Sequence, residues 1–303
     1  MTNSSEVMKQ DALVSAPIEH KHSNGLVKKI LAKCAIYLVL LLLYAPLIYI
    51  TVFSFSASKT TGVWSSFTFD NYTTLFSSSN AYAKAIWSAA GNTMIVALSA
   101  ALISTVLGTL GAIGMFYLRN KFCKSSMNFI TQIPIVNAEI VTAVSLCVLF
   151  AVLSKSIGLE RNMVTLIIGH CVLALPYVVI SVTPKLEQMD PALYEAAIDL
   201  GANRVQALWK VIIPEIVPGI LSGFMLSITL SLDDFVITAF TKPSTKGFNT
   251  ISTYVDGITA KGPLPKQLRA FTAVLFAVIL IVMIGMNVKM SIDRRKAKKF
   301  IKE

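Results

Sequence analysis

The sequence predicts an all-α polytopic membrane protein with six transmembrane helices. Of its 303 residues, 54% are hydrophobic and only 14% are charged, whereas an average soluble protein has about 25% charged residues. Apolar runs long enough to cross a hydrocarbon core of about 30 Å recur between clusters of Lys and Arg. The net charge of +11 therefore reflects residues that orient helices against an anionic inner leaflet, and we expect no nucleic-acid partner.

The six predicted spans are stretches of about 20 or more residues that lack charges or contain only an acidic interruption. They lie between Lys33 and Lys59, between Lys84 and Arg119, from about 129 to 153, between Arg161 and Lys185, from about 214 to 240, and between Arg269 and Lys289. Glu139 interrupts the third span, and Asp233 with Asp234 interrupts the fifth.

The distribution of Lys and Arg predicts that both termini are cytoplasmic, because this orientation puts 18 of the 27 on the inner side. Residues 1–27 are polar and contain no apolar stretch, so we expect a disordered cytoplasmic tail and no signal peptide. Residues 28–290 form the predicted transmembrane domain, and residues 291–303 a basic cytoplasmic tail.

The sequence lacks the motifs of common enzymes. It has no G-x-x-x-x-G-K-[ST] loop for a nucleoside triphosphate and no H-E-x-x-H zinc site, and its four cysteines are widely spaced. We therefore expect no metal, no bound cofactor and no catalytic activity in this chain. The weakest alternative is an intramembrane protease that pairs His170 with a serine, because a lone histidine hydrogen-bonded between helices is commoner.

The segment 184–214, between the fourth and fifth spans, is the most informative part of the sequence. Asp190 followed by Pro191 is typical of a helix N-cap with proline at the first helical position. Gly201 suits the left-handed conformation that commonly follows the last turn of a helix. We therefore expect a short amphipathic helix on the cytoplasmic side. Its predicted apolar face comprises Leu193, Ala196, Ala197 and Leu200.

The polar face of this helix is acidic. Interfacial helices usually present Lys and Arg to anionic headgroups. This one instead carries Glu187, Asp190, Glu195 and Asp199. The two alternatives are a helix lying among headgroups and a helix docked on a protein, and the acidic face favours the protein partner.

The same segment resembles the signature of a known family. Glu195-Ala196-Ala197, three residues, Gly201, nine residues and Val-Ile-Ile before Pro214 resemble the EAA-x3-G-x9-I-x-L-P motif of binding-protein-dependent ABC importer permeases. Valine and isoleucine replace the motif's isoleucine and leucine. The segments TLIIGHCVLALPYVVISVTPKLEQMDPALYEAAIDLGA and PEIVPGILSGFMLSITLSLDDFVITAFT are similar to the C-type permease subunit of spermidine/putrescine importers. The resemblance covers residues 60–290, approximately.

The resemblance implies a type I (MetI-like) permease fold and a non-catalytic, multi-pass subunit of an ATP-driven polyamine importer in the cell membrane. Besides the lipid bilayer, the implied partners are a homologous permease subunit, a dimer of ABC ATPases that binds the ATP and Mg, and an extracytoplasmic polyamine-binding protein. In the family, the loop forms a coupling helix that docks on the ATPase. This assigns ATPase coupling to Asp190, Leu193, Tyr194, Glu195, Ala196, Ala197, Asp199, Gly201 and Pro214.

Three acidic residues interrupt the predicted spans: Glu139, Asp233 and Asp234. A charge inside a membrane costs at least about 2.5 kcal/mol and usually faces a partner or a water-filled path. One hypothesis is that they line the path and oppose the ammonium groups of a polyamine. The other is that they pair with Lys or Arg of a second subunit or cap a broken helix. The likeness to the polyamine importers favours the path.

Two further alternatives concern the cargo and the class of transporter. The same architecture serves an importer of another small solute, such as ferric iron, thiamine or an aminophosphonate, and acidic path residues argue against anions without separating cations. A stand-alone secondary transporter would need no acidic docking helix and often shows an inverted repeat, which is not visible in this sequence.

Overall fold

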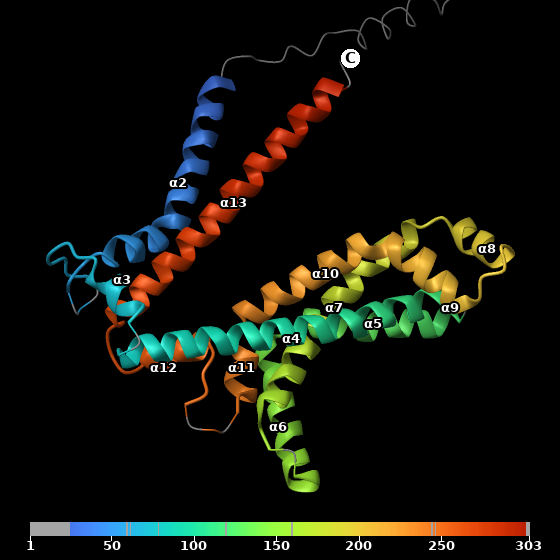
Figure 1. Cartoon of the computed structure of the whole chain (residues 1–303), viewed down its shortest axis with the longest axis horizontal. Helices are drawn as coiled ribbons and strands as arrows, with labels where there is room; N and C mark the ends of the chain where they lie inside the picture. The colour runs from blue at the N-terminus through green and yellow to red at the C-terminus, as the bar shows by residue number, and fades with distance from the viewer. Residues whose placement is uncertain are drawn as a thin grey trace, which may run out of the picture. The chain divides into compact units, whose positions relative to one another are not determined.

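The computed structural model describes residues 25–300 except Lys59, Thr61, Ser78, Arg119, Leu159, Ser244 and Lys246. The predicted N-terminal tail lies outside this part except for its last three residues, which begin the first helix. Figure 1 shows the helical architecture. The helices are α2 (Gly25–Phe53), α3 (Asp70–Leu75), α4 (Ala81–Tyr117), α5 (Lys121–Val136), α6 (Glu139–Ile157), α7 (Met163–Gln188), α8 (Pro191–Asp199), α9 (Arg204–Ala207), a π-helical turn η1 (Leu208–Ile212), α10 (Ile213–Asp233), α11 (Val236–Thr241), α12 (Ile251–Thr259) and α13 (Lys266–Phe300).

The helices confirm the predicted all-α polytopic fold. Within the described residues, five segments are long and apolar enough to cross a membrane: Lys33–Phe53, Ala81–Tyr117, Glu139–Ser156, Met163–Gln188 and Arg204–Asp233. The sixth predicted span lies within α13, which runs without a break from Lys266 to Phe300. The predicted basic tail therefore continues this helix, and its residues 301–303 lie outside the described part.

The chain forms two compact units, and the candidate site lies entirely in one of them. One unit comprises the described residues up to Ser56 together with those from Thr272, and the other runs from Ala57 to Phe271. The centre of the second unit is a three-helix core in which α4, α7 and α10 all contact one another. These helices carry most of the buried aliphatic side chains of the site.

Glycine sets the distance between the core helices. A Cβ atom added to Gly108 of α4 would lie 2.7 Å from the Cβ of Val178 in α7, closer than real Cβ contacts. On the other side, a Cβ on Gly223 of α10 would lie 3.1 Å from the Cα of Val178. Small residues at such crossings let membrane helices pack backbone to backbone, so Val178 is held between two glycine faces.

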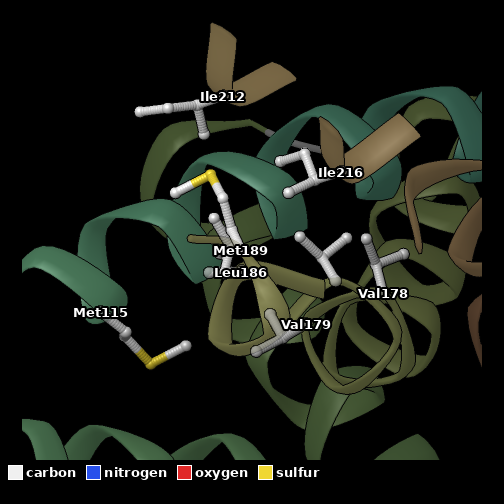
Figure 2. Close-up of a cluster of buried hydrophobic side chains, with 9 residues drawn as sticks. Met115, Val178, Val179, Leu186, Met189, Ile212 and Ile216 are labelled. Carbon is white, nitrogen blue, oxygen red and sulfur yellow. The ribbon is translucent and has the colours of Figure 1, made fainter. Parts of the chain in front are cut away.

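One cluster of buried hydrophobic side chains supports the loop between α7 and α10. Figure 2 shows its labelled members, which come from α4, α7 and the residue after it, the π-turn and α10. It comprises Ala112, Met115, Val178, Val179, Val182, Leu186, Met189, Ile212 and Ile216. Met189 directly precedes the N-cap of α8, so the base of α8 is anchored in the core.

The third predicted span differs from the structure. The sequence predicted one helix from about 129 to 153, whereas α5 ends at Val136 and α6 begins at Glu139. Pro134 removes a backbone donor from the last turn of α5, and Asn137 is extended, with φ −73° and ψ 144°. Glu139 therefore lies in the first turn of α6, where the helix dipole favours a negative charge.

The fifth predicted span is also divided. The helix α10 ends at Asp233, Asp234 is extended with φ −64° and ψ 129°, and the short helix α11 begins at Val236. The side chain of Ile237 in α11 packs with Ala143, Leu146 and Phe150 of α6 and with Leu173 of α7. The two aspartates therefore occupy a supported helix break, not the interior of a continuous helix.

Candidate functional site

The loop between α7 and α10 forms the helix that its sequence predicts. The Asp190 carboxylate accepts a hydrogen bond from the Ala192 N–H at 2.9 Å, and Pro191 occupies the first turn of α8. At the other end, the Gly201 N–H donates to the Ile198 carbonyl at 2.9 Å and the Ala202 N–H donates to the Ala197 carbonyl at 3.0 Å. This pair of bonds is a Schellman motif, so both ends of α8 are fixed by local sequence.

Gly201 has the predicted left-handed conformation, with φ +86°. A Cβ atom added there would meet no heavy atom within 4 Å. The requirement for glycine is therefore conformational, because an L-residue with a side chain pays about 1 to 2 kcal/mol in this region. The turn directs the chain from α8 into α9 without any crowding by neighbouring atoms.

The return into the core passes through a π-helical turn. The segment from Arg204 is helical through α9, widens to a π-turn at Leu208–Ile212 and continues as α10. Pro214 has no N–H to donate to the preceding turn, and single π-turns commonly accommodate such a defect in a helix. The sequence motif ending in Pro214 therefore marks a local widening at the start of α10.

The two sides of α8 have different surroundings. Tyr194 packs against the core cluster, and its ring centroid lies 5.7 Å from that of Tyr117 in α4. Leu200 is 89% exposed and Leu193 is 44% exposed, so the described residues leave both leucines of the predicted apolar face open. The charged and small residues Glu195, Ala196 and Asp199 are exposed as well.

The exposed apolar side chains continue beyond α8. Val205 of α9 and Trp209 of the π-turn are 63% and 65% exposed. We call Leu193, Leu200, Val205 and Trp209, together with the acidic residues Glu195 and Asp199, the loop surface. A cavity of about 700 Å³ lies beside it, lined by Ile113, Tyr117, Tyr194, Arg204, Leu208 and Ile212. Large apolar side chains exposed together indicate an interaction surface, and the acidic residues suit a protein partner better than anionic headgroups.

At the opposite end of α10, the two adjacent aspartates have different environments. Asp233 is exposed, whereas Asp234 is 6% exposed. The Asp234 carboxylate accepts hydrogen bonds from the backbone N–H groups of Ile237 at 3.1 Å and Thr238 at 2.8 Å. It also accepts one from the Thr238 hydroxyl at 2.8 Å. For Asp234, this geometry favours the hypothesis of a cap on a broken helix.

His170 of α7 completes this polar cluster. Its Nε2 atom lies 2.9 Å from the Thr238 hydroxyl and 3.6 Å from an Asp234 carboxylate oxygen, and its Nδ1 atom lies 2.7 Å from the Ser231 hydroxyl. His170 is 1% exposed and Ser231 is 4% exposed. A serine thus lies beside the histidine, but water does not reach the pair. The hydrogen bonds join α7 to α10 and α11, as expected of a histidine between helices.

Sequence patterns identified only part of this cluster. Asp234 and His170 were singled out, but Ser231 and Thr238 are common residue types in apolar segments. The available signal was their spacing, because Ser231 and Thr238 lie three residues before and four residues after Asp234. Glu139 is exposed in the first turn of α6. In the described part of the chain, no hydrogen bond or ion pair joins it to either aspartate.

Comparison with known families decides the class of this protein. Residues 104–298 match the family model described as "Binding-protein-dependent transport system inner membrane component". This chain belongs to that family. It is therefore a multi-pass membrane component of a binding-protein-dependent transport system.

The relatives of this permease are similar over most of their length. It is 32% identical to the putrescine transport system permease protein PotI of Escherichia coli K12, over 78% of this chain and 82% of that protein. It is 35% identical to the spermidine/putrescine transport system permease protein PotC of Haemophilus influenzae, over 67% of this chain and 76% of that protein.

Solved structures support the permease fold. A bacterial ABC transporter that imports alginate contains a chain that matches with a TM-score of 0.65 at 16% identity, over 89% of this chain and 98% of that one. The same type of transporter bound to its periplasmic protein gives 0.65 at 21% identity, over 88% and 94%. The inward-facing MetNI methionine transporter gives 0.51 at 16% identity, over 67% and 91%. These structural similarities show that the chain has the permease fold.

Proposed function

We propose that this permease is the transmembrane subunit of an ATP-driven importer of polyamines of the spermidine and putrescine type. It lines the path together with a homologous permease subunit. A dimer of ABC ATPases supplies the ATP and Mg sites, so this chain binds no cofactor and is not itself catalytic. An extracytoplasmic polyamine-binding protein delivers the cargo. Both termini lie in the cytoplasm, which puts α8 on the side of the ATPases.

The observation that carries the proposal is that α10 connects the loop surface at one end to the exposed Asp233 carboxylate at the other. At 1.5 Å per residue, its 21 residues extend about 31 Å, the thickness of a hydrocarbon core. Asp233 thus lies near the outer surface in the proposed orientation. An exposed carboxylate there opposes an ammonium group, as in the polyamines named for the relatives PotI and PotC.

The packing provides a route for mechanical coupling. Tyr194 of α8 and Leu208 of the π-turn both pack on the core cluster formed by α4, α7 and α10. Closure of the ATPases that displaces α8 therefore moves side chains already packed on α7 and α10. A packed core transmits displacement as a rigid-body shift of helices. The exposed loop surface is where we place the contact with the ATPase.

The test is co-purification followed by reconstitution. The tagged permease is expressed with its candidate ATPase, sister permease and binding protein, and the purified complex is placed in vesicles that contain ATP. We expect uptake of radiolabelled spermidine or putrescine that requires ATP and the binding protein. Uptake of ferric iron or thiamine but of neither polyamine would refute the cargo. Transport by this chain alone would refute its role as a dependent subunit.

A further inference from the structure

The hydrogen bonds around His170 run in one direction. A carboxylate only accepts, so the Thr238 hydroxyl donates its single proton to Asp234. The Thr238 oxygen is then the acceptor for His170, so Nε2 carries the imidazole proton. Nδ1 of the neutral ring is left as an acceptor, and the Ser231 hydroxyl donates to it. The relay runs from Ser231 through His170 and Thr238 to Asp234.

This relay holds both halves of the broken helix against α7. Ser231 belongs to the last turns of α10, Thr238 belongs to α11, and His170 lies between them on α7. The backbone of Asp234 is also fixed, because its N–H donates to the Leu230 carbonyl at 3.1 Å and its C=O accepts from the Ser252 hydroxyl at 3.0 Å. Every polar group of Asp234 is therefore bonded within this chain.

Asp233 directly precedes the fixed residue Asp234 in the chain but takes no part in the relay. It is the last residue of α10, and its side chain is exposed. In the described residues, no hydrogen bond or ion pair engages its carboxylate. A carboxylate that must oppose a flexible cation gains affinity when its position is fixed before binding.

We propose that Ser231, His170 and Thr238 are positioning residues, which lock Asp234 so that the neighbouring Asp233 carboxylate is held in place for the cationic substrate. This inference rests on the proposed function, because it assumes that Asp233 meets the cargo. It assigns a substrate-affinity role to three buried side chains that do not touch the substrate. It also gives the two adjacent aspartates separate tasks.

The test compares matched hydroxyl deletions in the complete importer. Ser231→Ala and Thr238→Val remove relay hydroxyls. Ser227→Ala and Thr241→Val are the controls, because among the described residues these buried hydroxyls bond only to the carbonyls of Gly223 and Ile237 in their own helices. We expect each relay variant to raise the KM for polyamine uptake about fivefold, the effect of one hydrogen bond. The maximal rate per assembled complex and both control variants should stay within twofold of the parent.

A second arm asks whether the relay acts through Asp233. In an Asp233→Asn background, which itself raises KM, Thr238→Val should add no further increase. In the parental background, Thr238→Ser, which keeps the hydroxyl, should leave KM at the parental value. An additional fivefold increase in the Asp233→Asn background would overturn the positioning role, since the relay would then act elsewhere. The same conclusion follows if only the maximal rate falls, or if neither relay variant assembles while both controls do.

The outcomes separate this inference from the proposed function. If the parental importer moves no polyamine, the proposed function fails at the first measurement. If it does, but Asp233→Asn leaves KM unchanged, the path role of Asp233 and the relay both fail. If Asp233→Asn raises KM and the relay variants behave like Ser227→Ala and Thr241→Val, the relay alone is refuted.

Discussion

Replacing Asp234 by asparagine should destabilise the protein, whereas the same change at Asp233 should not. The two carboxylate oxygens of Asp234 each accept a backbone N–H, from Ile237 at 3.1 Å and from Thr238 at 2.8 Å. An amide side chain has only one oxygen. Whichever way it is oriented, its NH2 group faces one of these N–H donors, so one buried backbone N–H loses its acceptor.

The expected magnitude follows from the number of bonds lost. Leaving a buried donor unsatisfied costs about 1 to 3 kcal/mol. Hydrogen bonds between membrane helices average about 0.6 kcal/mol, because the unfolded state in the membrane also finds partners. The bond lost here lies within the helix break and leaves a buried N–H of Ile237 or Thr238 unsatisfied, so the first range applies. We expect Asp234→Asn to lower the free energy of unfolding by about 2 kcal/mol. Asp233→Asn changes an exposed side chain and should remain within about 0.5 kcal/mol of the parent.

The assay is reversible unfolding of the purified permease in mixed micelles by increasing fractions of denaturing detergent, followed by circular dichroism. The two variants differ by the same atoms at neighbouring positions, so each controls for the effect of the substitution itself. Equal stability of Asp234→Asn and the parent would refute the carboxylate cap. A larger loss for Asp233→Asn would show that the assignment of buried and exposed aspartates is reversed.

Three other predictions, one of them with a control substitution, test the packing and the loop. Gly201→Val should leave the helix content intact but reduce transport per ATP hydrolysed at least fivefold. The reason is that a β-branched residue in the left-handed conformation costs about 1 to 2 kcal/mol, which strains the turn after α8. Normal coupling in reconstituted vesicles would contradict this prediction. Gly108→Ala should lower the free energy of unfolding by about 1 to 3 kcal/mol, because the added Cβ would clash with Val178. Its control, Gly111→Ala, places the Cβ in open space and should be neutral or slightly stabilising. Similar effects of the two substitutions would refute the close approach of α4 and α7. Glu195→Lys reverses one charge of the loop surface. It should reduce co-purification of the ATPase several-fold at low salt and less at high salt, because salt screens the charges. Unchanged co-purification would argue against ATPase binding at the loop surface.

The features predicted best from sequence are those determined by neighbouring residues. The N-cap at Asp190 and the left-handed Gly201 are local, and the structure has both. The long apolar helices α2, α4 and α7 follow from uncharged length alone. The coupling roles implied by the motif, and the path role inferred from acidic residues inside the predicted spans, remain predictions, because they depend on partners that this chain does not contain.

The features that sequence missed depend on contacts between distant segments. The apolar pattern of α8 does not single out Tyr194, yet Tyr194 makes the contact with the core cluster, while Leu200 of the predicted apolar face is exposed. Ser231 and Thr238 have ordinary helix propensities, and their importance arises only because His170, more than 60 residues earlier, lies beside them. The length of an apolar run also cannot locate the break after Val136, where Pro134 and the extended Asn137 interrupt the helix.

The break at Asp234 and the burial of its carboxylate are one structural event. In an unbroken helix, the N–H groups of Ile237 and Thr238 would donate to the carbonyls of Asp233 and Asp234, four residues earlier. Ending α10 at Asp233 frees those two N–H groups, and they are the donors that the Asp234 carboxylate accepts. The Asp234 carbonyl, which the break also releases, accepts the Ser252 hydroxyl instead. A buried charge is thereby satisfied by the backbone that it interrupts, and Asp233 is left with a free carboxylate at the end of a membrane-long helix.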